Sequence, residues 1–257
     1  MPTPPLIRVV EREALVYSRL LRGLAFSTFV QPALYLGAMG IGLGGLVKAH
    51  TGAVDGVTYL EFIAPGLLVA SAMQLAASES MWPVMGGAKW MRQFHGVVAT
   101  PIGPGELFGG YVLWTAIRSM LGAVAFLLVA ALLGAVPSAW GVLAIPAAGL
   151  CAAAFCSPLT AFSIMQESDA SFPLIMRLGV LPLFLFSGTF FPINQLPRGL
   201  RPFAALSPLW HGVELARDAT TGHFDAAPVA AHILVLVACI AAGAYFGVRR
   251  FSKRLTS

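Results

Sequence analysis

Charged side chains are scarce in this chain: they make up 11% of its 257 residues, whereas hydrophobic residues make up 58% and the mean hydropathy is +0.81. A soluble domain of this length needs more polar surface than that. The sequence therefore predicts an integral membrane protein. Its apolar runs do not alternate with polar residues, which excludes a transmembrane β-barrel and favours helices.

The motifs of most membrane enzymes are also missing. The chain has no G-x-x-x-x-G-K-[ST] run, so it cannot bind ATP through a P-loop of its own, and it has no H-E-x-x-H or G-x-S-x-G motif. Its three cysteines lie inside predicted spans, where a thiol behaves as a small hydrophobe: Cys151, Cys156 and Cys239. We therefore predict no catalytic residue, no metal site and no cofactor bound by this chain.

The apolar runs predict an all-α polytopic protein with one transmembrane domain over residues 1–257. A run of about 20 residues crosses the hydrocarbon core as a helix. We predict six spans, at 24–47, 59–82, 111–136, 142–165, 172–191 and 228–248. The N-terminus lacks the pattern of a cleavable secretory signal, so the first span should be retained. An amphipathic helix at 4–22 is expected to lie in the membrane interface, although a solvated lead-in helix fits the same pattern.

The distribution of Lys and Arg predicts the orientation. Basic residues near the ends of spans stay on the cytoplasmic side. With both termini inside, ten Lys and Arg residues lie in the cytoplasm and four lie outside. This split favours cytoplasmic termini and an even number of spans. The net charge of +5 needs no nucleic-acid partner, because the basic residues cluster at helix ends that face an anionic leaflet.

Five ionisable residues fall inside or beside predicted spans, where a charge is costly and is a candidate for function: Glu61, Glu79, Arg118, Arg177 and His232. Four of them lie near span ends and can reach the interface. Arg118 is deeper, and it either pairs within the protein or belongs to a translocation path. No carboxylate lies convincingly at mid-membrane, which disfavours a proton-coupled carrier.

Two connections between spans have structure of their own. The connection at 83–110 is polar and contains Pro101 and Pro104, so we expect turns there. The segment 187–224 is broken repeatedly, and irregular backbone at membrane depth is tolerated only where protein buries it or water reaches it. We predict a re-entrant helical hairpin, with a helix at 206–220 capped by Ser207 and begun by Pro208. An ordinary amphipathic outer loop is the alternative.

These two connections carry a family resemblance. The segment 186–224 contains F-S-G-x-x-F-P at 186–192, L-P at 196–197 and S-P-L-x-H-x-V-E-L-x-R at 207–217. A second run, ATPIGPGE at 99–106, resembles a T-P-x-x-x-x-E motif between spans two and three. Together they resemble ABC-2 type transporter permeases, in the branch of nodulation-factor exporters and daunorubicin-resistance-like drug exporters.

The resemblance implies a subunit of an ATP-driven exporter in the bacterial cytoplasmic membrane. Its partners would be two copies of a separate ABC ATPase that holds ATP and Mg, a second permease that is identical or paralogous, the lipid bilayer and a hydrophobic small-molecule or lipid substrate.

The resemblance also implies two sets of site residues. Residues of 83–110 would couple the permease to the ATPase: Lys89, Trp90, Arg92, His95, Thr100, Pro101 and Glu106. Residues of 187–224 would form an extracytoplasmic gate: Gly188, Phe191, Pro192, Pro197, Pro208, His211, Glu214 and Arg217.

Three other functions are compatible with parts of the sequence. A polysaccharide or glycolipid exporter of the same fold would need a continuous aromatic-lined channel. A membrane assembly subunit without a transport role would lack an ATPase partner. A membrane enzyme is the weakest alternative, because no catalytic constellation is present.

Overall fold

The computed structural model describes residues 3–43, 56–223 and 225–256, although not every side chain between 20 and 43. The described elements are helices, as the sequence predicts. They are α1 (Pro5–Tyr35), η1 (Leu36–Leu43), α3 (Tyr59–Met85), η2 (Gly86–Trp90), α4 (Gln93–Val98), α5 (Pro104–Leu132), η3 (Ala139–Leu143), α6 (Ala144–Ser163), η4 (Asp169–Ser171), α7 (Phe172–Ile175), η5 (Met176–Val180), α8 (Leu181–Phe186), η6 (Ile193–Gln195), α9 (Arg201–Leu206), α10 (Pro208–Thr221) and α11 (Ala226–Leu255).

Within the described residues, five helical stretches are long and apolar enough to cross a membrane: Tyr59–Trp90, Pro104–Leu132, Ala139–Ser163, Asp169–Phe186 and Ala226–Leu255. They correspond to the second to sixth predicted spans. The stretch Asp169–Phe186, which corresponds to the fifth predicted span, ends five residues before the predicted boundary, because the backbone leaves the helix at Ser187. Of the predicted first span, residues 24–43 are helical, and 44–47 lie outside the described residues.

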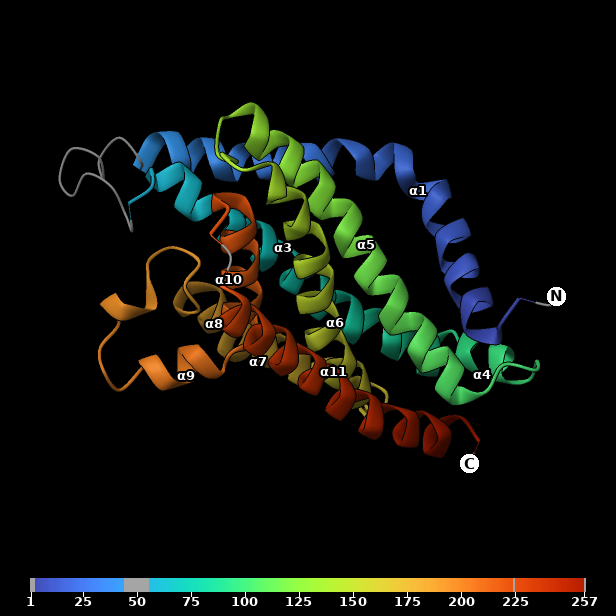
Figure 1. The fold of residues 1–257 in the computed structure, drawn as a ribbon. Coiled ribbons are helices and arrows are strands. Elements are labelled where there is room, and N and C mark those ends of the chain that lie inside the picture. The colour runs from blue at the N-terminus through green and yellow to red at the C-terminus, as the bar shows by residue number, and fades with distance from the viewer. Residues whose placement is uncertain (1–2, 44–55, 224, 257) are drawn as a thin grey trace.

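The N-terminal helix differs from the prediction in one respect. An interfacial helix at 4–22 and a separate first span were expected, but Pro5–Tyr35 is one helix that bends along its length (Figure 1). Its first turns pack on α5, where a Cβ on Gly110 would lie 2.6 Å from Val9 Cβ. This close approach requires glycine and fixes the N-terminal part of α1 against a span.

Local signals explain where two spans begin. Thr58 and Glu61 form a capping box at α3: the Thr58 N–H donates to Glu61 Oε2 at 2.7 Å, and Thr58 Oγ1 accepts from the Glu61 N–H at 3.3 Å. At α5, Glu106 Oε2 accepts from the Gly103 N–H at 2.7 Å, and Pro104 follows at the first helical position. Glu61 was predicted to reach the interface, and in the structure its carboxylate caps the start of α3.

The core of the bundle lies around α3 and α6. The span windows of α3 and α6 are 72% and 61% buried, whereas those of Asp169–Phe186 and α11 are 11% and 17% buried. Small residues allow α11 to approach α6 closely. Ser157 Oγ of α6 donates to the Ile240 carbonyl of α11 at 3.0 Å. A Cβ on Gly243 of α11 would lie 2.4 Å from the same Ser157 Oγ. The outer helices keep large apolar faces for lipid or another subunit.

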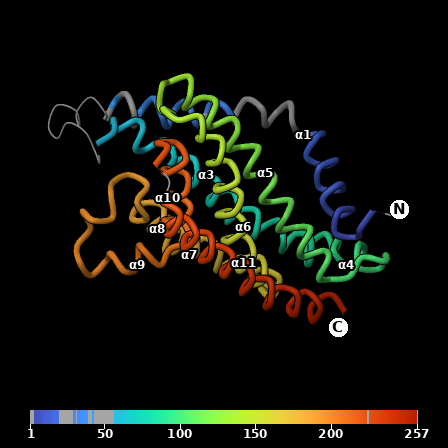
Figure 2. The backbone as a smooth tube through the Cα atoms, in the orientation of Figure 1, coloured from blue at the N-terminus to red at the C-terminus, as the bar shows by residue number. Residues whose placement is uncertain are grey.

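The two structured connections lie at different ends of the bundle. Figures 1 and 2 show α4 near both chain termini, and show α9 and the segment around η6 at the far side of the molecule. The N-terminal helix, the 83–110 connection and the end of α11 therefore share one end, as the predicted topology requires.

Candidate transport site

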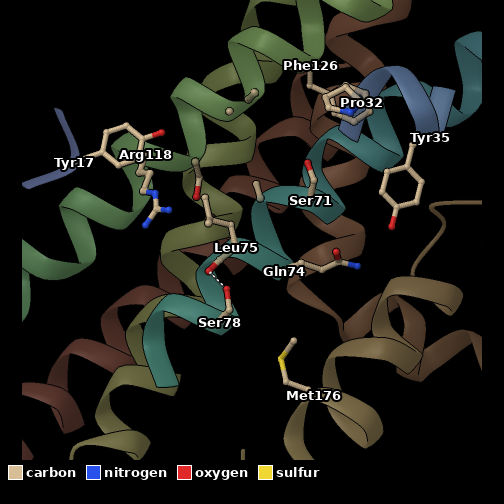
Figure 3. A pocket seen from close by; sticks show the side chains of 14 residues that line it. Tyr17, Pro32, Tyr35, Ser71, Gln74, Leu75, Ser78, Arg118, Phe126 and Met176 are labelled. Carbon is tan, nitrogen blue, oxygen red and sulfur yellow. Dashed lines mark hydrogen bonds between the residues drawn. The ribbon is translucent and has the colours of Figure 1, made fainter. Parts of the chain in front are cut away.

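A pocket of about 390 Å³ opens between α1, α3 and α5 (Figure 3). Met176, from η5, lies at its border. Its lining is mixed. Apolar groups include Leu75, Phe126 and Met176, and polar groups include Tyr17, Gln74 and Arg118. A pocket with both kinds of lining inside the spans can hold a compound that has an apolar part and a polar part.

The polar residues that α3 presents to this pocket are regularly spaced. Ser71, Gln74 and Ser78 recur at intervals of three and four residues, which places them on one face of the helix. Ser71 and Ser78 each donate a hydrogen bond to a carbonyl three residues earlier, at 2.8 and 2.9 Å. The sequence analysis missed this face, although its polar periodicity within an apolar span was a signal that could have revealed it.

Arg118 lies near the middle of α5 and forms an ion pair with Glu79 of α3, at 2.7 Å. Its guanidinium also lies 5.0 Å from the centre of the Tyr17 ring. The side chains of Arg118 and Glu79 are 20% and 24% exposed. Of the alternatives that the sequence left open for Arg118, pairing within the protein is thus observed. The same side chain also lines the pocket, so pairing does not remove it from the space between the spans.

At the end of the bundle that holds both chain termini, residues 86–101 comprise η2, α4 and the turn that follows, and we call them the η2–α4 segment. This segment exposes several predicted coupling residues and is anchored by one aromatic side chain. Trp90 is 58% exposed, and Arg92, His95, Thr100 and Pro101 are exposed as well. Phe94 is 1% exposed, and its ring centre lies 6.1 Å from those of Tyr111 in α5 and Phe251 in α11. The segment is thus an exposed surface that the buried Phe94 ring anchors to two spans.

An ion cluster ties the same end together. Glu167, between α6 and η4, accepts from Lys89 Nζ at 2.9 Å and pairs with Arg254 of α11 at 2.7 Å. These two partners lower the pKa of the Glu167 carboxyl to about 2, first through their hydrogen bonds and then through their charge. The cluster joins the 83–110 connection, a second connection and the C-terminal helix.

The N-terminal helix reaches this end too. Arg12 donates to the side-chain oxygen of Gln93 at 2.7 Å, and a second pocket of about 300 Å³ lies between α1 and α4. Glu106 is separate from the exposed surface, since its carboxylate caps α5. Among the predicted coupling residues, Lys89 and Glu106 bind other segments or cap a helix, and Thr100 Oγ1 donates to the Val97 carbonyl at 2.6 Å.

The segment after α8 is buried irregular backbone. A Cβ on Gly66 of α3 would lie 2.7 Å from the Thr189 carbonyl oxygen, so the backbone at Thr189 packs directly on the second span. Ser187 Oγ donates to Ser207 Oγ at 3.0 Å. Ser207 Oγ also accepts from the Leu209 N–H at 3.2 Å and caps α10, as predicted.

Helix α10 itself packs between the spans. A Cβ on Gly212 would meet Cys151 of α6 at 2.8 Å and Val69 of α3 at 2.9 Å. Such contacts seat a helix of 14 residues deep against two spanning helices. Helix α10 is therefore packed into the bundle, and its re-entrant position in the membrane stays a prediction.

Arg217 connects the two parts of this region. It pairs with Glu214 at 2.6 Å, donates to the Gly188 carbonyl at 2.8 Å and lies 4.0 Å from the centre of the Phe62 ring. Gly188 has a φ of 79°, in the region that favours glycine. Three predicted gate residues are thus brought together on the face of α3.

His211 has a partner that the sequence did not predict. Its Nδ1 lies 2.7 Å from Nδ1 of His232 in α11, and both side chains are 8% exposed. Burial, and then the proximity of His232, lowers the pKa of His211. His232 was expected to reach the interface, but it is held inside the protein because His211 supplies a hydrogen-bond partner there.

Other predicted gate residues lie apart from this group. Pro197 is exposed between η6 and α9, Phe191 is half-buried, and Pro192 is buried where the chain leaves the irregular segment. Pro208 begins α10 and so has a role in helix initiation.

A profile of the ABC-2 type transporter family matches residues 6–220, a range that includes the pocket-lining helices, the η2–α4 segment and nearly all of α10. The chain belongs to the ABC-2 type transporter family. This ABC-2 protein is therefore a membrane transport subunit, and the resemblance of its two structured connections to that family is confirmed.

Several relatives of this ABC-2 subunit share one name. Nodulation protein J of Rhizobium leguminosarum bv. viciae is 30% identical over 230 residues, which cover 90% of this chain and 87% of the relative. Nodulation protein J of Sinorhizobium fredii is 28% identical over 251 residues, covering 98% and 94%. The relative from Neorhizobium galegae is 26% identical and is covered to 94%. The similarity extends over almost the whole length of these proteins.

Proposed function

We propose that this ABC-2 subunit moves a hydrophobic or amphipathic compound, such as a drug, lipid or glycolipid, out across the bacterial cytoplasmic membrane. A separate ATPase subunit supplies the energy, since the sequence has no P-loop. The observation that carries this proposal is the pocket between α1, α3 and α5, whose lining combines apolar and polar groups within spanning helices.

Two copies of the ATPase are proposed to dock at the end that holds α4 and both termini. In support, Trp90 and Met91 are 58% and 67% exposed, a large apolar surface beside charged residues. Phe94 beneath them is buried against α5 and α11. A force applied at Trp90 would therefore pass into two spans. This end is cytoplasmic in the proposed topology.

A second permease, identical or paralogous, is proposed to complete the transport path. The supporting observation is the large exposed apolar surface on Asp169–Phe186 and α11. Lipid alone can cover such faces, but a path for an amphiphile needs walls on more than one side. The pocket opens beside η5, which belongs to one of these poorly buried stretches.

The proposal is tested by purifying the tagged chain gently from its host and identifying the bound subunits by mass spectrometry. We expect an ATPase with a P-loop, and ATP-dependent transport by the reconstituted complex. Recovery of the chain alone, under conditions that preserve a known membrane complex, would instead support the non-transporting assembly subunit.

The coupling surface has its own test. Trp90→Ala and His95→Ala should abolish transport-linked ATP hydrolysis while the protein still inserts and folds. Trp140→Ala is a matched control, because Trp140 in η3 is 61% exposed and belongs to a different connection. Unchanged coupling in the Trp90 and His95 variants would remove this surface from the mechanism.

A further inference from the structure

The pocket contains a charge and a hydroxyl that an anionic head group would satisfy. Arg118 is the one charged residue among the described side chains that line it, because its partner Glu79 lies beside the pocket without lining it. A ligand in the pocket therefore meets the guanidinium of this ion pair, while the carboxylate of Glu79 lies outside the lining. An arginine guanidinium has donors in a planar fork that matches carboxylate and phosphate groups.

The next residue, Ser119, provides the second observation. Ser119 is 2% exposed, and its Oγ has no hydrogen-bond partner within the described part of the chain. The other two serines that line the pocket donate to backbone carbonyls. A buried hydroxyl without a partner is costly, so a ligand that accepts a hydrogen bond there would gain affinity.

The rest of the pocket suits an apolar tail. Leu75, Phe126 and Met176 line it, and Figure 3 shows their side chains around the same space as Gln74 and Arg118. Gly122, one turn beyond Arg118, leaves room: a Cβ placed on it would meet nothing within 4 Å. An apolar tail can thus extend along α5 while its head group remains near Arg118 and Ser119.

We propose that this pocket binds an amphiphile with an anionic head group, held by Arg118 and the Ser119 hydroxyl, with its tail beside Gly122 and Phe126. This inference deepens the proposed function and rests on it in assigning the pocket to the transport path. The head group has two sources: a compound that is transported, or an anionic lipid that stays bound. Both share the same recognition chemistry.

The test uses the purified chain in phosphatidylcholine nanodiscs, without ATPase. The probe is a dodecyl phosphate analogue with a photoreactive diazirine in its tail, and mass spectrometry maps the labelled peptides. We expect labels on α3 and α5. Dodecyl phosphate should compete at least about tenfold better than dodecanol or dodecyltrimethylammonium, as a charge-assisted contact requires. Equal competition by the three compounds would overturn the inference.

Three variants separate binding from folding. Gly122→Leu fills the pocket and keeps the ion pair, so it should abolish labelling without loss of thermal stability. Leu121→Phe is its control, because Leu121 is 50% exposed and does not line the pocket. Glu79→Gln removes the partner that competes for Arg118, so it should strengthen binding. A purely structural ion pair predicts the opposite, and weaker binding in Glu79→Gln would contradict the inference.

The source of the head group follows from two further measurements. An anionic lipid that co-purifies with the chain, and is absent from Gly122→Leu, identifies a resident lipid. ATP-driven movement of the probe by the reconstituted complex identifies a transported compound. Either result supports the inference. Transport of a neutral compound by a complex that does not bind dodecyl phosphate would overturn it and leave the proposed function intact.

Discussion

The two structured connections of this ABC-2 subunit are held in opposite ways. The η2–α4 end is joined to its neighbours by exposed ion pairs around Glu167, whose side chain is 69% exposed, and by one buried ring, Phe94. The α10 region is held by buried backbone contacts, a half-buried arginine and a pair of buried histidines. Exposed ion pairs can break and re-form at little cost in free energy, whereas tightly packed buried groups cannot rearrange without losing their contacts. The first region is suited to contact a moving partner, and the second is suited to stay fixed.

The largest contrast is expected from a pair of glycines. Gly66→Ala places a Cβ 2.7 Å from the backbone oxygen of Thr189. A backbone atom cannot avoid this clash by changing rotamer, as a side-chain atom could. We expect destabilisation by about 1–3 kcal/mol or more, as for other overpacked cores. Gly96→Ala in α4 meets nothing within 4 Å, so it should stabilise its helix slightly. Thermal unfolding of both variants in detergent measures this difference, and equal shifts would remove the contrast.

The next largest effect should come from Arg217. Arg217→Gln removes the ion pair with Glu214, the bond to the Gly188 carbonyl and the contact with Phe62. Loss of one partner of a half-buried pair leaves polar groups unsatisfied, and we expect a cost of about 2–3 kcal/mol. Arg217→Lys should recover only part of it, because lysine lacks the planar fork. Full recovery in the lysine variant would show that charge alone matters there.

Acid should loosen the α10 region through His211. Its pKa is lowered in the folded protein, so its contribution to stability is complete above the ordinary value of 6.5 and is lost as the pH falls through the lowered value. Trp210, whose ring centre is 5.0 Å from that of His232, reports the change by fluorescence. His211→Asn should weaken this pH dependence, and His95→Asn at the exposed end should leave it unchanged. Identical profiles would exclude the histidine pair as its origin.

The smallest effect on stability is expected at Glu167. The folded-state pKa of about 2 lies below the ordinary value of 4.5 for this carboxyl, so the contribution of the ion pairs is present above 4.5 and is lost as the pH falls through about 2. Because the carboxylate is exposed, salt screens these pairs. Glu167→Gln should barely change the unfolding temperature, yet it should alter hydrogen exchange in η2 and at the end of α11. A large drop in unfolding temperature would contradict this, because it would mean that the Glu167 ion pairs stabilise the fold as strongly as the buried contacts of the α10 region.

The sequence predicted the positions and order of five described spanning stretches, because long apolar runs have few alternatives in a membrane. It also predicted the Ser207 cap and the proline that begins α10, since these depend on residues close together in the chain. It missed the partners that come from distant segments. Glu79 beside Arg118, His232 beside His211 and Glu167 beside Lys89 are pairs set by packing, and no local pattern specifies them.

The same reason explains the missed pocket. Ser71, Gln74 and Ser78 form a polar face within the second span, and their spacing is visible in the sequence. What the sequence does not specify is that α1 and α5 leave a space opposite that face. The polar face of α3 was therefore predictable from its periodicity, whereas the space opposite it depends on how α1, α3 and α5 cross.

The unbroken course of α1 has a mechanical consequence. Its 31 residues include Arg12, which contacts Gln93 of α4, and Pro32 and Tyr35, which lie on the wall of the pocket. At about 1.5 Å per residue, the stretch from Arg12 to Tyr35 follows about 35 Å of helix axis. Because the helix is continuous through its bend, a tilt near Arg12 would displace Pro32 and Tyr35. A subunit that shifts α4 would thereby change the width of the pocket without touching any residue that lines it.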